Sequence, residues 1–342
     1  MYSVDEYIGM MESADRAPNT LKLYRAIFRS YGKFLGVPVD EIHNHLEPAN
    51  LKNYAAWLKG HSGKSIKMRL SVLRAYFEEN GVTFRPMELK VLNAKRIEDH
   101  DDKPLELATI QKMVDLANPH MKAIITFLVS TGCRPGEAMK ITLGDVKGDT
   151  VTIRNDIAKG RRGGTSYLHA EAREYLDLFL RERDAYISLA DERAGTFNRP
   201  RPDHDDRLFG LAYSTFQQKF TRLYQAVDGE QGKYRARITP HSLRRYFRTN
   251  AVKTMGLDIV EKIMRHEGYL TGSYVRLTDE EIRAGFHAGE DVLYITRRDR
   301  RHSENALALL KAETDRREAE HAGFVILMEK RMKELEDKIK SD

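Results

Sequence analysis

Hydrophobic residues recur every three or four positions through the first hundred residues, which is the period of one face of an α-helix. Residues 19–36 show this best, with apolar side chains at Leu21, Tyr24, Phe28, Tyr31 and Phe34. We expect Asn19 or Thr20 to cap the start of this helix. Gly36, followed by Pro38, should end it.

Two more helices are predicted over residues 51–58 and 65–79. The second has apolar residues on one side and basic residues elsewhere, namely Lys67, Arg69 and Arg74. A helix that packs by its apolar side and is basic on another side can lie along DNA. The first hundred residues therefore indicate a small helical domain.

A charged segment, KRIEDHDDKP, follows at residues 95–104 and has no large apolar residue after Ile97, so it indicates an interdomain linker. Helices are predicted beyond it over residues 107–117 and 120–130. The runs VTIRND and TSYLH, which flank GRRGG, favour two strands of a β-hairpin. The predicted tip of this hairpin carries Lys159, Arg161 and Arg162.

Helical patterns resume at Ala170 and again from Tyr213, while residues 193–207 favour a loop. Residues 279–295 indicate one more helix that ends in a short apolar piece. A highly charged tail follows, in which apolar residues step by three and four at Val325, Met328, Met332, Leu335 and Ile339. Two heptads are too few for a stable coiled coil, so a tail helix that docks on the body or on a neighbouring subunit is equally plausible.

The expected fold is mainly α-helical with a small antiparallel β-hairpin or sheet. We divide the chain into a helical DNA-binding domain (1–95), a linker (96–104), a second domain (105–296) and a charged helical tail (297–342).

Composition narrows the class of protein. The chain has 342 residues, of which 32% are charged and 41% hydrophobic, and no apolar run approaches the roughly 18 residues of a membrane span. The first residues lack the basic start and apolar stretch of a signal peptide. Cys133 is the single cysteine, which excludes an internal disulfide and a cysteine-rich zinc site. A reducing cytoplasmic compartment fits this composition.

The net charge is only +6, but the basic residues are concentrated. Residues 57–77 contain no acid and five basic residues: Lys59, Lys64, Lys67, Arg69 and Arg74. Residues 232–253 again contain no acid and seven basic residues: Lys233, Arg235, Arg237, Arg244, Arg245, Arg248 and Lys253. Either tract alone could be a solvated face, but two of them in different halves of the chain favour a nucleic-acid partner.

Two short motifs carry chemistry that suits a phosphate. In TGCRPGE (131–137), Arg134 follows an apolar helix, and Glu137 is spaced to hold its guanidinium by a bidentate pair. In PHSLRRYFRT (240–249), His241 and Arg244 share a helix face, and Pro240 suits a helix start. Taken singly, each motif could equally be structural: an ion pair at a helix junction, or a histidine cap.

Together with RHEGYLTGSYVRL (265–277), these motifs resemble in order and content the tyrosine recombinase (lambda-type integrase) family. Arg134 and Glu137 match its T-G-x-R-x-x-E motif, and Lys159 falls where the family has a lysine on a β-hairpin. His241 and Arg244 match its H-x-x-R box, and His266 its second histidine. The resemblance covers most of the chain.

The third motif departs from the family in two places. The nucleophilic tyrosine usually falls about nine residues after the second histidine, whereas Tyr274 falls eight after His266 and Tyr269 only three. Tyr274 is therefore the expected nucleophile. Arg265 stands where a small residue is usual, which could alter the local packing.

The resemblance implies a site-specific recombinase that cuts and rejoins DNA through a 3′-phosphotyrosyl link on Tyr274. Arg134 and Arg244 would bind the phosphate oxygens, and Lys159 would protonate the leaving 5′-hydroxyl. His241 and His266 would add hydrogen bonds or take the phenol proton. Neither a metal nor a nucleotide cofactor is expected, because the phosphotyrosyl link keeps the bond energy.

The expected partner is double-stranded DNA at attachment sites. We expect the protein to be a homotetramer on DNA and a monomer or a dimer when free. No membrane partner is expected. Besides the residues of 57–77, we expect DNA contacts from Arg161, Arg162, Arg245 and Arg248. The segment after Tyr274 resembles integrases of archaeal cells and their viruses or plasmids. The expected localisation is the cytoplasm, in association with the nucleoid.

Three alternatives stay open at this stage. A DNA-binding protein of the same fold would lack cleavage. A type IB topoisomerase would share the chemistry but relax supercoils without joining two sites. A metal-dependent nuclease would use some of the 12 histidines and form no covalent adduct.

Overall fold

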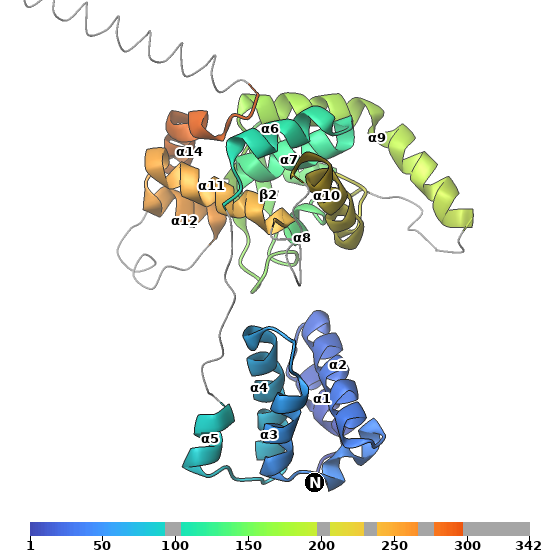
Figure 1. Cartoon of the computed structure of the whole chain (residues 1–342). Coiled ribbons are helices and arrows are strands. Elements are labelled where there is room, and N and C mark those ends of the chain that lie inside the picture. Colours follow the sequence, from blue (N-terminus) through green and yellow to red (C-terminus); the bar gives the residue numbers. More distant parts are fainter. Residues whose placement is uncertain (93–103, 197–205, 229–237, 266–276, 297–342) are drawn as a thin grey trace, which may run out of the picture. The chain divides into compact units, whose positions relative to one another are not determined.

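The chain divides into two compact units, Met1–Asp101 and Asp102–Asp342. This is a computed structural model, and it describes residues 1–92, 104–196, 206–228, 238–265 and 277–296. All but the last residue of the predicted linker (96–104) lies outside the described residues, as does the whole predicted tail (297–342). Each unit is described by itself (Figure 1).

The first unit is a helical bundle around an aromatic core. Its elements are α1 (Val4–Ser13), α2 (Pro18–Leu35), the 3-10 helix η1 (Val39–Asn44), α3 (Pro48–Trp57), α4 (Gly63–Glu79) and α5 (Pro86–Leu92). Tyr31, Tyr54 and Phe77 are fully buried, and Tyr31 meets each of the other two rings edge to face, a geometry that aromatic pairs favour. The periodic hydrophobic positions thus form the core that their spacing predicts.

The predicted cap of α2 is wrong, whereas its predicted end is confirmed. Ala17 is the N-cap and Pro18 the first helical residue, so the helix begins before Asn19 and Thr20. Proline suits this position because it lacks the N–H that would be unpaired there and its φ is already helical. Gly36 ends the helix in the left-handed conformation, with φ +76°.

The second unit is mainly helical and carries one small sheet. In chain order its elements are α6 (Leu107–Leu116), α7 (Pro119–Thr131), α8 (Pro135–Ala138), η2 (Leu143–Asp145), β1 (Val146–Lys147), β2 (Thr150–Ile153), β3 (Gly164–Tyr167), α9 (Ala170–Thr196), α10 (Tyr213–Asp228), α11 (Pro240–Met255), α12 (Leu257–Met264), α14 (Asp279–Gly289) and η3 (Glu290–Leu293).

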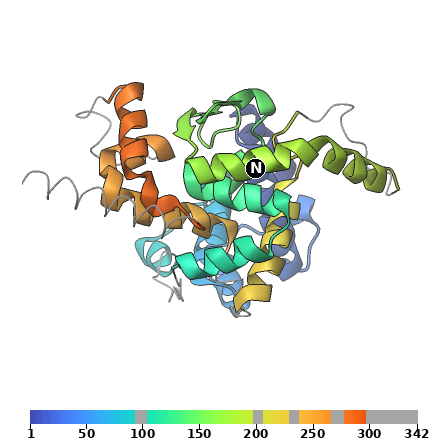
Figure 2. The same cartoon turned by 90° about the horizontal axis from the view of Figure 1, so that it is seen from above.

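Helix α7 forms the centre of the second unit. It is buried along nearly all its length, and α9 and α11 pack against it (Figures 1 and 2). An apolar helix of this kind is expected where neighbours cover every face. Its C-terminal end is therefore a rigid place from which to present a side chain.

The predicted β-hairpin is confirmed, and so is the fold class. β2 pairs antiparallel with β3 from Thr150↔Tyr167 to Ile153↔Gly164, and the two-residue strand β1 pairs with the other edge of β2. The loop predicted over 193–207 begins too early, because α9 continues to Thr196. Glutamate, arginine and alanine in ADERAG are good helix formers, which explains the longer helix.

Within the described residues, no helix is both long and apolar enough to cross a bilayer.

Candidate active site

The site is built at the junction between α7 and α8. Gly132 ends α7 in the left-handed conformation with φ +58°. A Cβ at this position would lie 2.2 Å from Cδ1 of Phe247 on α11, so only glycine lets α11 approach the junction this closely. Arg134 then stands at the N-cap of α8, with Pro135 as the first helical residue.

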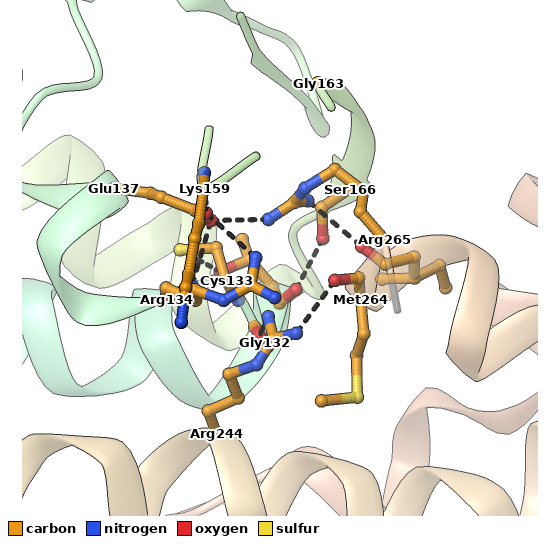
Figure 3. Close-up of polar contacts among 12 residues, drawn as sticks. Gly132, Cys133, Arg134, Glu137, Lys159, Gly163, Ser166, Arg244, Met264 and Arg265 are labelled. Carbon is orange, nitrogen blue, oxygen red and sulfur yellow. Dashed lines mark hydrogen bonds and ion pairs between the residues drawn. The ribbon is translucent and has the colours of Figure 1, made fainter. Parts of the chain in front are cut away.

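Glu137 is a buried carboxylate that gathers four N–H donors. Its Oε1 accepts hydrogen bonds from Nη1 of Arg134 and from the backbone N–H of Lys159, both at 3.0 Å. Its Oε2 accepts from the backbone N–H of Arg134 at 3.3 Å and from Nη2 of Arg265 at 2.8 Å (Figure 3). Residues far apart in the sequence therefore meet at one carboxylate.

The expected bidentate pair between Arg134 and Glu137 is wrong. Only one guanidinium nitrogen of Arg134 reaches Glu137, since the second carboxylate oxygen is occupied by Arg265. Nη2 and Nε of Arg134 donate to no residue in the described part of the chain. These donors remain for a ligand, and the Arg134 side chain is 22% exposed.

The charge of Glu137 is stabilised by its surroundings. Burial alone would raise the pKa of this carboxyl group, but the N–H of Lys159 and the guanidinium groups of Arg265 and Arg134 outweigh it. The pKa of Glu137 therefore lies below its usual value. Glu137 is an anion near neutral pH and keeps its donors in place.

Arg244 is the second arginine of the site, and it is buried. Its Nη1 donates to the carbonyl of Gly132 at 2.6 Å and its Nη2 to the carbonyl of Met264 at 2.8 Å, which fixes it between the ends of α7 and α12 (Figure 3). Burial, reinforced by the charge of Arg134, lowers the pKa of Arg244 to about 10. The group is still a cation at neutral pH.

His241 and Lys159 lie on the solvent side of the same cluster. Desolvation lowers the pKa of His241, and the positive charges of Arg244 and Arg134 lower it further, followed by those of Arg245 and Lys159. His241 is thus held as a neutral imidazole at pH 7. Lys159 is exposed at the hairpin tip, anchored through its backbone N–H to Glu137.

The structure brings together five of the expected site residues, Arg134, Glu137, Lys159, His241 and Arg244, and their catalytic roles stay predictions. His266 and Tyr274, as well as Tyr269, lie outside the described residues. The sequence singled out Arg265 only because it stands where a small residue is usual. Nothing in the local pattern shows that its side chain turns back toward Glu137. The described residues contain no group of three or more His, Cys, Asp or Glu side chains that could hold a metal ion.

The expected DNA-binding residues differ in how they are placed. Lys59, Lys64, Lys67, Arg161 and Arg162 are exposed. Others make contacts inside the protein: Arg69 donates to the Tyr54 hydroxyl, Arg74 pairs with Glu78, Arg245 donates to Ser242 and Arg248 pairs with Glu261. Contact of either group with DNA stays a prediction.

The site contains a buried anion that orients one guanidinium, and a second guanidinium, a lysine and a neutral histidine lie beside it. This arrangement suits the transfer of a phosphoryl group. Residues 103–281 match the model of the phage integrase family, and residues 4–79 match that of the phage integrase N-terminal SAM-like domain. The chain belongs to the phage integrase family. The resemblance to tyrosine recombinases and the enzyme class that it implied, a site-specific recombinase, are thereby confirmed.

Individual relatives agree with this assignment. Tyrosine recombinase XerA of Thermococcus onnurineus is 23% identical over 291 residues, which cover 82% of this chain and 92% of the relative. Among solved structures, a lambda integrase tetramer bound to a Holliday junction has a TM-score of 0.51 at 18% identity, with 80% of this chain and 79% of that chain covered. The Tn1549 transposon integrase in complex with transposon right end DNA has a TM-score of 0.55 at 17% identity, with 84% and 99% covered.

Proposed function

We propose that this protein cuts and rejoins double-stranded DNA at attachment sites through a 3′-phosphotyrosyl intermediate on Tyr274. The observation that carries the proposal is the convergence of Arg134, Arg244 and Lys159 around the buried carboxylate of Glu137. Guanidinium groups held in this way are preorganised for the charge that develops on a phosphate under attack.

In the proposed mechanism, Arg134 and Arg244 bind the phosphate. Both are planar cations at neutral pH, and both have their direction fixed by hydrogen bonds to buried oxygens. Arg134 keeps two nitrogens for the non-bridging oxygens. Because the donors are already oriented, little reorganisation is needed when the transition state forms.

In the proposed mechanism, His241 or His266 accepts a proton and Lys159 donates one. The phenol oxygen of Tyr274 attacks phosphorus while the P–O5′ bond breaks, and the phenol proton passes to the neutral imidazole of His241 or to His266. The departing 5′-oxygen takes a proton from Nζ of Lys159. In the rejoining step, a 5′-hydroxyl of a second strand attacks the phosphotyrosyl link, and the protons return.

We assign DNA binding to the helical domain (1–95) and catalysis to residues 105–296. Two separate compact units support this division. On DNA we propose a homotetramer, in line with the solved lambda integrase tetramer. The encoding element, an archaeal virus or plasmid, stays a prediction.

A nicked suicide substrate tests the nucleophile, because loss of the short 5′ fragment traps the covalent intermediate. Wild type and Tyr269→Phe should both form a protein–DNA adduct in EDTA, whereas Tyr274→Phe should form none, since it lacks the attacking oxygen. DNA binding by Tyr274→Phe should be unchanged.

Each alternative has its own signature in this assay. No adduct with wild type would favour a DNA-binding protein without cleavage. Cleavage that EDTA abolishes, without an adduct, would favour a metal-dependent nuclease. An adduct together with plasmid relaxation but no joining of two sites would favour a type IB topoisomerase.

A further inference from the structure

We propose that Arg265 is a positioning residue for DNA cleavage: it holds one oxygen of Glu137, so that Arg134 keeps donors for the phosphate and Lys159 stays at the site. This inference rests on the proposed function and adds to it a residue to which the family resemblance gives no role. Its effect passes through Glu137, and Arg265 itself need not touch DNA.

The position of Arg265 points to a role for its side chain rather than its backbone. Arg265 is the C-cap of α12 and has φ +53° and ψ 44°, the left-handed conformation that favours glycine or asparagine. Glycine would suit this backbone better. What arginine contributes here must therefore come from the side chain.

That side chain turns inward and has one charged partner within the described residues. It is only 4% exposed, and its Nη2 lies 2.8 Å from Oε2 of Glu137, which is itself 4% exposed at the side chain. Nη1 donates to the carbonyl of Ile263 at 3.1 Å, and the buried Nε has no hydrogen-bond partner in the described part of the chain. Glu137 is thus the group that determines where the guanidinium lies (Figure 3).

The strand β3 leaves room for this arrangement. Gly164, its first residue, has φ +153°, and a Cβ there would lie 3.1 Å from Cδ and 3.2 Å from Cγ of Arg265. The aliphatic part of Arg265 therefore passes directly over a residue without a side chain. In this way the end of α12, the hairpin and the α7–α8 junction meet at Glu137.

Loss of Arg265 would free Oε2 of Glu137 except for the longer bond from the Arg134 backbone. Two parallel bonds between a carboxylate and one guanidinium are a favoured geometry. We therefore expect Glu137 to turn and take a second nitrogen of Arg134, away from the phosphate. The same turn would weaken the bond that anchors Lys159.

The charge of Glu137 gives a second, independent readout. The groups that face it are Arg134 and Cys133 from the α7–α8 junction, Lys159 from the hairpin, Arg265 from α12 and Arg244 from α11. The low pKa of Glu137 favours its anion, and that anion is lost as the pH falls. Without Arg265 the pKa rises, so cleavage should fail at a higher pH.

The test measures adduct formation on the nicked substrate at saturating DNA, using the full chain. We expect Arg265→Met to slow cleavage by about tenfold or more while Kd for DNA stays within about threefold, since a positioning defect lowers kcat and not binding. The acid side of the pH profile of cleavage by Arg265→Met should move to higher pH. Arg265→Lys restores a cation and should recover most of the rate and the wild-type pH profile.

Two further variants separate positioning from folding. Arg265→Gly relieves the left-handed backbone but should cleave as slowly as Arg265→Met. Arg183→Met removes another buried arginine, which donates to the carbonyls of Arg207 and Leu208, and should lower thermal stability without shifting the pH profile.

The outcomes are distinguishable. If wild type forms the Tyr274 adduct and all three Arg265 variants match its rate and pH profile, the inference is overturned and the proposed function stands. A wild-type rate in Arg265→Gly alone would also overturn it, because the backbone would then be what matters. If wild type forms no adduct, the proposed function fails, and this inference fails with it.

Discussion

At the scale of single residues, Gly132 sets the geometry of the site, because it ends α7 and its carbonyl oxygen accepts a hydrogen bond from Arg244. Gly132→Ala would place a Cβ 2.2 Å from the Phe247 ring in a backbone conformation that alanine disfavours. We expect a loss of at least about 2 kcal/mol in the free energy of unfolding, measured by chemical denaturation of the full chain.

Gly136 is a matched control in the same motif. A Cβ there meets nothing within 4 Å, and the residue lies in helix α8. Gly136→Ala should therefore be neutral or stabilise the protein by up to about 1 kcal/mol, because alanine restricts the unfolded chain. Equal destabilisation by the two alanine variants would contradict the contact between Gly132 and Phe247 as the cause.

At the scale of elements, the hairpin between β2 and β3 is what delivers Lys159. Its tip is closed by the N–H of Gly163, which donates to Oδ1 of Asn155 at 2.8 Å. A Cβ on Gly163 would lie 2.3 Å from the carbonyl oxygen of Ile153, so Gly163→Ala must displace the tip. We expect this variant and Lys159→Met to slow cleavage by about 10²-fold or more, the contribution typical of a general acid.

A substrate with sulfur in place of the bridging 5′-oxygen identifies the step affected. A thiolate leaves without protonation, since a thiol has a pKa of about 8.5, so both variants should regain most of their rate on it. Lys147→Met, which changes an exposed lysine on β1, should cleave normally on either substrate. Failure of the sulfur substrate to rescue Lys159→Met would show that Lys159 is not the acid.

The helices and strands differ in how well the sequence predicts them. Helices with strong periodicity and the hairpin strands are found where expected, because local hydrophobic spacing determines them. The start of α2 is missed because Pro18 overrides the polar residues that follow it. The role of Arg265 could not be predicted, since its contact with Glu137 joins positions 128 residues apart. The predicted bidentate pair between Arg134 and Glu137 does not form, because the same distant residue, Arg265, binds the second oxygen of Glu137.

At the scale of the whole molecule, each unit has its own hydrophobic core and its own basic residues, which together are expected to bind one DNA. In the first unit, Lys64 and Lys67 lie on α4, are exposed and have no ion-pair partner within the described residues. Their contribution should therefore be electrostatic and independent of DNA sequence.

The experiment removes positive charge from the first unit. It then measures DNA binding and also cleavage, which depends on the second unit. The double variant Lys64→Gln/Lys67→Gln should weaken DNA binding and reduce the slope of log K against log salt by about 2, roughly one unit for each lost phosphate contact. At saturating DNA its rate of adduct formation should match wild type, because neither substitution changes Glu137 or the residues bonded to it. Lys112→Gln/Lys147→Gln removes the same charge from exposed positions of the second unit and should leave the slope unchanged. An equal drop in slope for both pairs would mean that net charge, rather than the basic side of α4, determines DNA affinity.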